Sequence, residues 1–534
     1  MKNSAQDRGP ISKLSISLLL LELACLAEPA SLFAQGNPAT PKVLQVGTYK
    51  GKTGDFSSIQ AAVNAASPGD WILVAPGDYK EVGGVLITTP GIHLRGMDRN
   101  GVVVDGSKLY SPPCSPNSKD QNIVAGGLNG IEVLQVDGVS IENLTVCNFL
   151  GDQFANNGNE IWWNGGDGSG QIGMGSYWGS YLTASSTFFD ASIPNQAQYG
   201  IFVSNAKGPG SITYSYASNM GDSGFYVGAC ADCNTTLQFV HSTNNPQGFS
   251  GSNSGGHLVI EDSEWDHNQS GIVPSSLSVY DPPSPQDGAC PNAPGNSCTV
   301  IQRNYVHDNN NPNTPVNFAV NPLAGSALVG SGIDLSGGRN NTVQQNLLVS
   351  NGSWAIVLND YGDYTPPPVG SPFCVGGELN YTPPSPYDQL YVIPPPGFTT
   401  GLPIPCYFPS FGNHVLSNVF SGNGFFGNPT NGDLANAALP YSLNNCFQGN
   451  VDQAGKVTSS PSNLQATCGL AWKPNKAQEF LLTAELGCAS IGLCTGLPKQ
   501  PGYPVQTQVH LLPIPHEATM QDPCNGVPKN SWCP

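Results

Sequence analysis

The sequence predicts an all-β solenoid, a parallel β-helix in which each turn of the chain stacks on the one before it. Two observations carry this prediction: asparagines recur in one frame after short apolar or β-branched runs, and the frame has a fixed step with insertions between later units. Such a pattern is typical of solenoids, whose units bury apolar side chains only against their neighbours. The asparagines of this first frame are Asn244, Asn268, Asn309, Asn351 and Asn423.

A second frame lies a few residues earlier in each unit. A repeat of this length without helical periodicity suits one rung of a β-helix. Stacked asparagine side chains can bond to each other and to the turn backbone, so we expect a ladder at a turn. The members of the second frame, at steps of 24, 24, 41, 42 and 72 residues, are Ser215, Phe239, Ser263, Asn304, Asn346 and Asn418.

The first 35 residues are expected to be a secretory signal peptide. Lys2, Arg8 and Lys13 precede an apolar stretch over residues 14–27 that is too short to span a bilayer. No later stretch is long enough for a membrane helix. We therefore expect a secreted protein, located outside the cell, at its surface or in the periplasm.

Cysteine usage points to the same oxidising compartment. All but one of the 15 cysteines follow the expected signal peptide, which leaves an even number for disulfides. We expect pairs between cysteines that are close in sequence: Cys114/Cys147, Cys230/Cys233, Cys290/Cys298, Cys374/Cys406, Cys446/Cys468, Cys488/Cys494 and Cys524/Cys533.

The charge of the chain limits its partners. The net charge is −18 and no basic patch is present, which argues against nucleic acid as a partner. An acidic surface also repels a polyanionic glycan unless a cation such as Ca²⁺ bridges the two, so Ca²⁺ is a candidate cofactor. We expect a monomer without a membrane span.

Residues 55–80 predict a cap at the N-terminal end of the solenoid. Ile59, Ala62 and Val63 fall on one face of a short helix, then Pro68-Gly69-Asp70 makes a turn before a buried strand over 71–74. This order resembles the capping segment of the pectin-lyase-like superfamily of right-handed parallel β-helices. The resemblance extends over roughly residues 50–430 and implies a right-handed fold.

The resemblance divides the chain into three parts. Residues 1–35 are the signal peptide, 36–430 the β-helix domain with its cap at 50–80, and 431–534 a Cys- and Pro-rich C-terminal cap or, alternatively, a small separate module. Within the β-helix domain we expect a Gly-rich aromatic insertion at 150–182 and Pro-rich loops at 274–298 and 360–412.

Acid–base candidates occur in two successive units of the first frame. Asp266 aligns with His307, and His267 with Asp308. Neighbouring rungs lie about 4.8 Å apart, which lets a carboxylate orient an imidazole for proton transfer on a sugar. Arg303, in the same units, is the candidate to neutralise a uronate carboxylate. The alternative is that these polar residues only bond within the turns.

Other side chains offer weaker candidates. Trp162, Trp163, Tyr177 and Trp178 are candidate sugar-binding residues, with packing against the wall of the β-helix as the alternative. A carboxylate group at Asp334, Asp360 and Asp363 could bind Ca²⁺ or act in glycoside hydrolysis, but an ordinary loop entrance explains it as well.

Superfamily motifs do not fix the reaction. The Gly-His-Gly motif of polygalacturonases has its nearest match in Gly256-His257-Leu258, and the Asp-Pro-His motif of alginate epimerases in Asp266-His267. No family's catalytic residues are carried over. The expected function is to act on or bind a polysaccharide as a lyase, hydrolase or C5-epimerase, or alternatively to serve as a non-catalytic structural or adhesion protein.

Overall fold

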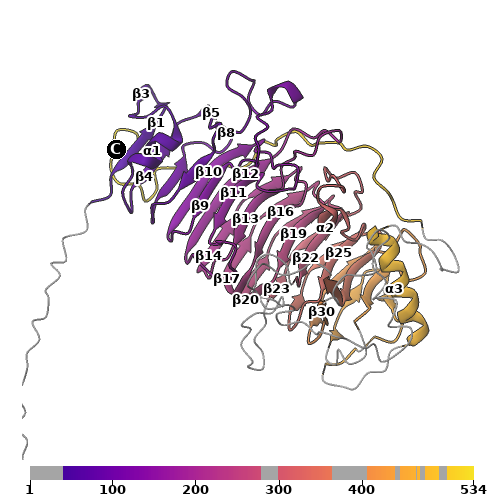
Figure 1. Cartoon of the computed structure of the whole chain (residues 1–534). Helices are drawn as coiled ribbons and strands as arrows, with labels where there is room; N and C mark the ends of the chain where they lie inside the picture. The colour runs from indigo at the N-terminus through magenta and orange to yellow at the C-terminus, as the bar shows by residue number, and fades with distance from the viewer. Residues whose placement is uncertain are drawn as a thin grey trace, which may run out of the picture. The chain divides into compact units, whose positions relative to one another are not determined.

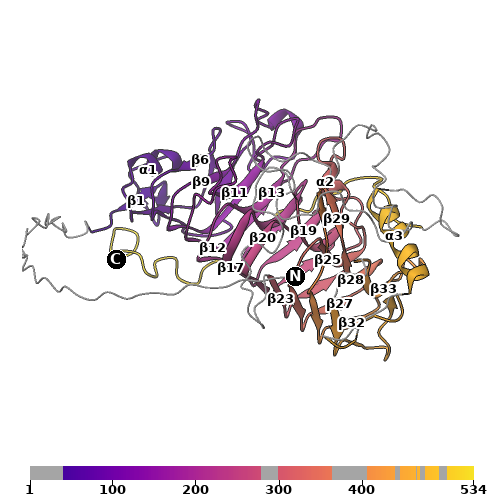
Figure 2. The same ribbon diagram turned by 60° about the horizontal axis from the view of Figure 1, so that its bottom comes forward.

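Most rungs of the solenoid contain three short strands, and each strand pairs in parallel with its equivalent in the next rung. The expected all-β parallel β-helix is confirmed. Figures 1 and 2 show the strands of successive rungs stacked side by side. The computed structural model describes residues 40–277, 299–363, 406–438, 445–464, 466–468, 475–491 and 502–534.

The strands form three faces. Strands β10 (Val139–Cys147) and β12 (Tyr177–Ser185) run through the bend between faces 2 and 3 and belong to both. Face 1 contains β6 (Val85–Ile87), β9 (Ile131–Leu134), β11 (Asn159–Asn164), β13 (Tyr199–Ser204), β16 (Ser223–Gly228), β19 (Gln247–Ser252), β22 (Ser270–Ser275), β25 (Ser331–Ser336), β28 (Trp354–Asn359), β33 (Gly432–Asn436) and β36 (Ser459–Ser460).

Faces 2 and 3 follow face 1 in each rung. Face 2 contains β1 (Val43–Val46), β4 (Trp71–Val74), β7 (His93–Gly96), β14 (Gly210–Thr213), β17 (Cys230–Gln238), β20 (Ser254–Glu261), β23 (Thr299–Gln302), β26 (Thr342–Gln344), β31 (His414–Leu416) and β34 (Cys446–Gln448). Face 3 contains β5 (Gly77–Lys80), β8 (Val102–Asp105), β15 (Tyr216–Ser218), β18 (His241–Thr243), β21 (Glu264–Asp266), β24 (Tyr305–His307), β27 (Leu347–Val349), β32 (Val419–Ser421) and β35 (Val451–Asp452).

Short elements lie outside the faces. Strands β2 (Thr48–Tyr49) and β3 (Lys52–Thr53) form one antiparallel pair, and β29 (Tyr361–Asp363) and β30 (Cys406–Phe408) form another. The helices are α1 (Ile59–Ala65), the 3-10 turn η1 (Ser118–Asp120), α2 (Pro322–Gly325) and α3 (Lys476–Ile491).

The predicted cap is present at the N-terminal end. Helix α1 begins after Ser58, whose side chain accepts a hydrogen bond from the backbone N–H of Ala61 at 3.2 Å. Ile59, Ala62 and Val63 are buried in the core of the first rungs. The helix therefore covers apolar side chains that the first rung would otherwise expose.

Bends between faces share one backbone device. At the bends with a buried asparagine, a residue with positive φ precedes it: Arg303 (φ 55°) precedes Asn304 and Asp308 (φ 50°) precedes Asn309. The buried residue then bonds to its equivalent in the next rung. This arrangement turns the chain sharply and leaves few backbone groups without partners.

The buried asparagines form three ladders, one at each corner. In each ladder a carboxamide oxygen accepts hydrogen bonds from the residue one rung earlier. At corner 2/3 the members are Ser263, Asn304, Asn346, Asn418 and Asn450. At corner 3/1 they are Asn245, Asn268, Asn309, Asn351 and Asn423. At corner 1/2 they are Thr299, Asn341, Asn413 and Asn445.

Two expected ladder positions were wrong by one residue. Asn244 has φ 58° and occupies the outward position before the ladder, so Asn245 is the ladder member. Phe239 (φ 56°) likewise lies one residue before the column, where its ring stacks on Tyr214 with centroids 5.0 Å apart. The third ladder, at corner 1/2, was not predicted.

The rungs extend past the boundary expected at residue 430. Strands β33 to β36 continue the stack, and α3 then packs on the outer side of face 1. Its Leu482 and Leu486 contact Trp354 and Val357. The segment 431–534 thus contains the last rungs, a covering helix and a C-terminal strap.

The strap, residues 502–534, runs back along the solenoid to the N-terminal cap (yellow in Figures 1 and 2). Its backbone and side chains bond in order to residues of ever earlier rungs: Asn313, Asn244, Asn219, Asn143 and Gln45. Residues 41–534 accordingly form one compact unit.

Arg99 is buried beneath the strap and bonds to it. Its side chain is almost fully buried and donates to Thr183 Oγ1 at 2.8 Å and to the carbonyls of Tyr214 and Ala518 at 3.0 and 3.1 Å. Burial lowers the pKa of Arg99 to about 10. Apart from Glu517 at 3.8 Å, these partners are neutral oxygens. Arg99 therefore stabilises the fold and is not exposed to bind a ligand.

Four of the expected disulfides are present: Cys114–Cys147, Cys230–Cys233, Cys446–Cys468 and Cys524–Cys533. Each of the other three expected pairs includes a cysteine outside the described residues. The expected signal peptide and most of both Pro-rich loops also lie outside the described residues. No helix within the described ranges is long and apolar enough to cross a membrane. The disulfides are compatible with an extracellular location, and secretion stays a prediction.

Replacing Asn346 with alanine tests the ladder. Asn346 Oδ1 accepts from the backbone and side-chain nitrogens of Asn304 at 2.9 and 3.0 Å, and its amide donates to Ile301 O and Asn418 Oδ1. Because the change leaves buried donors without an acceptor, we expect a loss of about 2–4 kcal/mol in unfolding free energy by urea denaturation.

Asn64→Ala is the matched control. Asn64 is exposed on α1 and bonds only to Gln60 among the described residues, so we expect a change within about 0.5 kcal/mol. Equal effects of the two substitutions would contradict a stabilising ladder.

Candidate functional site

Face 3 presents titratable side chains outward in two rows. Between the rows, the middle residues of β18, β21 and β24 (Ser242, Trp265 and Val306) are completely buried. The first outward row reads Tyr216, His241, Glu264, Tyr305 and Leu347 over five successive rungs. The second reads Ser218, Thr243, Asp266, His307 and Val349.

Asp266 holds two imidazoles, one on each carboxylate oxygen. His241 Nε2 lies 2.8 Å from Oδ1, and His267 Nδ1 lies 2.6 Å from Oδ2. Although Asp266 is largely buried, which disfavours its charge, the hydrogen bonds and charges of the two histidines lower the pKa of Asp266 to about 2. Asp266 is therefore ionised at any physiological pH.

The same pairing acts on His241 in the opposite direction. Burial disfavours the imidazolium, but the hydrogen bond and charge of Asp266, with the charges of Glu264 and Glu517, outweigh it and raise the pKa of His241. Tyr216 packs edge-on against the ring at 5.2 Å between centroids. His241 therefore holds its proton to a higher pH than a free histidine does.

His307 belongs to a second group, with Asp308 and Glu264. Its register partner is Asp266, as the sequence predicted, but its hydrogen bonds go elsewhere: Nδ1 to Asp308 Oδ2 at 2.9 Å and Nε2 to Glu264 Oε1 at 3.1 Å. Its ring stacks on Tyr305, with centroids 3.9 Å apart. Both ring nitrogens are thus engaged, and His307 is buried.

His267 is the most accessible imidazole of the cluster. It has φ 50° at the bend after β21, and 62% of its side chain is exposed. Only Nδ1 has a partner among the described residues, so Nε2 is left for another molecule. Asp308 occupies the equivalent bend one rung later, with 44% of its side chain exposed.

Sequence reasoning missed His241 and Glu264. His241 stands alone in an alternating apolar run, a pattern that indicates a wall residue rather than a ligand. The signal that could have found it is alternation: both residues lie two positions before the Asp266 row, so they point outward from the same face. The ligand atoms of His241, Glu264 and Asp266 lie within 4.8 Å of one another.

This cluster offers one nitrogen and two carboxylates to a cation. Ca²⁺ prefers oxygen ligands alone, whereas a mixed set suits zinc or a first-row transition ion better. The group therefore fits the expected Ca²⁺ poorly.

Arg303 is not joined to the histidines. Its Nε donates to Asp262 Oδ1 at 2.8 Å and its Nη2 to Glu261 Oε2 at 2.6 Å. Two carboxylates thus surround one guanidinium. Its expected role as a free charge neutraliser does not fit this pairing.

Comparison with known proteins gives the handedness of the fold. Residues 178–366 match the family model described as "Right handed beta helix region". The chain is a right-handed parallel β-helix. This agrees with the right-handed fold that the resemblance to the pectin-lyase-like superfamily implied. No curated protein matches the chain.

Several solved structures resemble this right-handed β-helix. The A-module of a mannuronan C-5 epimerase from Azotobacter vinelandii is 12% identical, with 74% of this chain and 91% of that chain covered and a TM-score of 0.39. An alginate lyase from Paenibacillus sp. is 11% identical, with 80% and 98% covered and a TM-score of 0.34. A pectate lyase is 14% identical, with 93% and 96% covered and a TM-score of 0.38.

The expected aromatic insertion is part of the β-helix itself, so the prediction for residues 150–182 needs correction. Trp163 on β11 and Tyr177 on β12 are completely buried in the core and cannot contact a polysaccharide. Trp162 stacks on Phe202 of face 1 with centroids 5.0 Å apart. Trp178 alone of the four is well exposed, at 40%.

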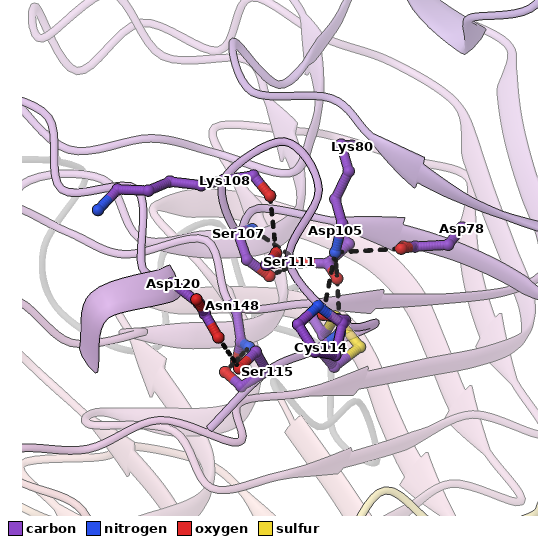
Figure 3. A network of polar contacts seen from close by, with 12 residues as sticks. Asp78, Lys80, Asp105, Ser107, Lys108, Ser111, Cys114, Ser115, Asp120 and Asn148 are labelled. Atoms are coloured by element: carbon purple, nitrogen blue, oxygen red, sulfur yellow. Dashed lines mark hydrogen bonds and ion pairs between the residues drawn. A yellow bond between two sulfur atoms is a disulfide. The ribbon is translucent and has the colours of Figure 1, made fainter. Parts of the chain in front are cut away.

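A second polar cluster, around Asp105, is structural (Figure 3). Asp105 is fully buried, bonds to Lys80, and accepts from the backbone N–H groups of Ser107 and Cys114. These bonds hold the loop that carries the Cys114–Cys147 disulfide against the rungs. With its acceptors used internally and its thiols oxidised, this cluster has no group left for chemistry.

The other expected carboxylate group also has a local role. Asp360 accepts from the backbone N–H of Ser410 at 2.6 Å, and the side chain of Asp363 lies outside the described residues. Asp334 on β25 is only 4% exposed and accepts from Ser336 Oγ at 3.0 Å. Burial raises the pKa of Asp334 to about 7.

Asp334 gives a prediction about pH and stability. Below about pH 4 the carboxyl is protonated in both folded and unfolded chains, whereas between pH 4 and 7 only the folded chain keeps its proton, so stability falls as pH rises. Asp334→Asn should remove this fall and raise the unfolding free energy at pH 8 by up to about 4 kcal/mol, with no gain at pH 4.

Asp190→Asn serves as the control for urea denaturation at both pH values. Asp190 is solvent-facing, and hydrogen bonds from Ser192 lower its pKa. It should therefore show no gain at pH 8. A wild-type stability that is flat from pH 4 to 8 would contradict the buried acid.

Proposed function

We propose that this β-helix acts on a polysaccharide by acid–base chemistry at the outer surface of β18, β21 and β24. The observation that supports this most is the sharing of Asp266 between His241 and His267. A buried carboxylate that bonds to a half-buried imidazole and to an exposed one can keep the first protonated and the second neutral within one site.

The roles follow from the hydrogen bonds. Asp266 accepts the Nδ1–H of His267, which fixes the tautomer whose Nε2 carries a lone pair, so His267 serves as the general base. His241, with its raised pKa, serves as the proton donor. His307, Asp308 and Glu264 form the neighbouring group of three at this edge of the surface.

A polysaccharide is the proposed substrate class because Glu264, Tyr305 and Leu347 are solvent-exposed at equivalent positions of three successive rungs. Polysaccharides are also the substrates named for the mannuronan epimerase and the pectate lyase that the chain resembles in fold. Lyase, hydrolase and epimerase activities occur on one fold, so the fold does not select the reaction.

The rival proposal is a non-catalytic extracellular structural or adhesion protein. It is favoured by the fact that most polar atoms of the cluster bond to each other, as they would in a purely structural row. The two proposals differ in what they require of the accessible Nε2 of His267.

Substitution of His267 separates them. His267→Ala should lower turnover of a polysaccharide substrate by about 10²–10⁴-fold and leave thermal stability nearly unchanged, since the ring is exposed. Asp266→Asn should lower turnover similarly. Activity should also fall as pH rises through the raised pKa of His241 and show no loss from Asp266 at mildly acid pH, where it stays ionised.

His257→Ala is the matched control. His257 also has positive φ, is 56% exposed in its side chain and bonds through Nδ1 to a carboxylate, Asp232, at 2.8 Å, but it lies on face 2. It should retain full activity. Equal activity of the His267 and His257 variants would contradict the proposed base, and absence of turnover and binding across a broad glycan panel would favour the structural protein.

A further inference from the structure

Basic residues are almost absent from the rungs that carry the candidate site. Between Lys119 and Lys456 the sequence contains only Lys207, Arg303 and Arg339. This count covers the whole sequence, including the segments 278–298 and 364–405. Any positive charge offered to a ligand over this stretch must therefore come from these three side chains, from histidines, or from the ends of the chain.

Two of the three lie away from face 3. Lys207 precedes β14, and Arg339 lies between β25 and β26, so both are at corner 1/2. That is the one corner which does not border face 3. The guanidinium of Arg339 lies over the ring of Phe411, 5.0 Å from its centroid.

The third, Arg303, does border face 3, at corner 2/3. Its charge is offset by two carboxylates, Glu261 at 2.6 Å and Asp262 at 2.8 Å. The pair also holds the guanidinium in place, since Nη2 donates to Asp262 as well. The net charge of this group is −1, so it repels an anion.

The two arginines of the N-terminal rungs are already engaged. Arg95 donates to Glu142 and to the carbonyls of Pro523 and Asn525, and Arg99 is buried under the strap. The strap instead adds a carboxylate, Glu517, whose charge contributes to the raised pKa of His241.

Carboxylates therefore outnumber cations around the cluster. Glu264, Asp266 and Asp308 lie on or at the edge of face 3 itself, in addition to Glu517 and the Arg303 group. In the proposed starting state His241 is protonated and His267 is not, so even with His307 protonated the three face 3 carboxylates exceed the two imidazolium charges. A surface of this sign repels a polyanion at close range.

We propose that the polysaccharide taken by this site is uncharged and that the reaction is hydrolysis of its glycosidic bond. This rests on the function proposed above. β-Elimination and C5 epimerisation both withdraw the proton next to a uronate carboxylate, whose negative charge the site must neutralise. Hydrolysis needs no charged group on the substrate, and face 3 has no surplus positive charge to neutralise a carboxylate.

The step balances without a further reactant. Water loses a proton to His267 Nε2 and its oxygen bonds to the anomeric carbon. The bond from that carbon to the bridging oxygen breaks, and the bridging oxygen takes a proton from His241. The proton on His267 then returns through solvent to His241, which restores the starting state.

Paired glycans test the proposal. Polygalacturonate and polymannuronate are compared with their carboxyl-reduced neutral forms and with neutral glucans, mannans, galactans and xylans. Binding is measured by affinity electrophoresis, and turnover by reducing ends and by the ultraviolet absorbance of unsaturated uronates. We expect retention and reducing ends with at least one neutral glycan, and at least tenfold weaker retention by both polyuronates at low salt.

Divalent cations are added in a parallel series. Tight binding of a polyuronate, or unsaturated product, with or without Ca²⁺ or Zn²⁺ would overturn the neutral substrate and leave the proposed polysaccharide function intact. Silence toward every glycan, charged and neutral, would overturn both. The two failures are thus distinguishable.

A gain of binding gives an independent test. The double variant Glu261→Gln/Asp262→Asn frees Arg303 and removes two negative charges, so retention by polygalacturonate should increase several-fold, and this gain should fade in high salt. Asp232→Asn removes one exposed charge on face 2 and releases His257 but no arginine or lysine, so it should show no gain. An unchanged polyuronate affinity in the double variant would contradict charge as the determinant.

Discussion

The rest of the structure depends on the register between rungs, which the buried asparagine ladders hold at all three corners. Each ladder residue uses its carboxamide oxygen for the rung before it and its amide for the rung after it, so a shift of one residue would break bonds in both directions. Because the ladder amides are buried, such a break leaves polar groups without water. The register is therefore the strongest constraint on which side chains meet.

That constraint explains why residues far apart in sequence form one cluster. His241, Glu264 and Tyr305 are 23 and 41 residues apart, yet they are direct neighbours in one outward row. The bend residue after β21, His267, has positive φ, which places its side chain beside the row. There it bonds to Asp266 of its own rung. A carboxylate in one rung can thus receive an imidazole from the rung before it and another from its own bend.

The sequence was sufficient for the fold and for half of the cluster. Asparagine spacing predicted the rungs and the meeting of Asp266 with His307, because a buried ladder tolerates few other side chains. It failed at the Asn244–Asn245 doublet, because both residues suit a turn. Only the register, in which Ser242 pairs with the buried Trp265, shows that Asn245 is the ladder member. It failed for Trp163 and Tyr177 because aromatic residues beside glycines resemble a surface loop, whereas here they fill the core. Hydrogen-bond partners of histidines depend on side-chain rotation, which spacing does not contain.

Stacking of equivalent positions also explains why acids and bases alternate around this site. Side chains in one row lie about 4.8 Å apart, so like charges in successive rungs repel, and a structural row is satisfied by simple pairs such as Asp232 with His257. Asp266 departs from that rule, because a carboxylate needs one imidazole for neutrality and this one has two. The second imidazole, His267, is exposed and adds nothing that the fold requires. A side chain that the packing does not need, held in one orientation by a buried charge, is what an acid–base site requires.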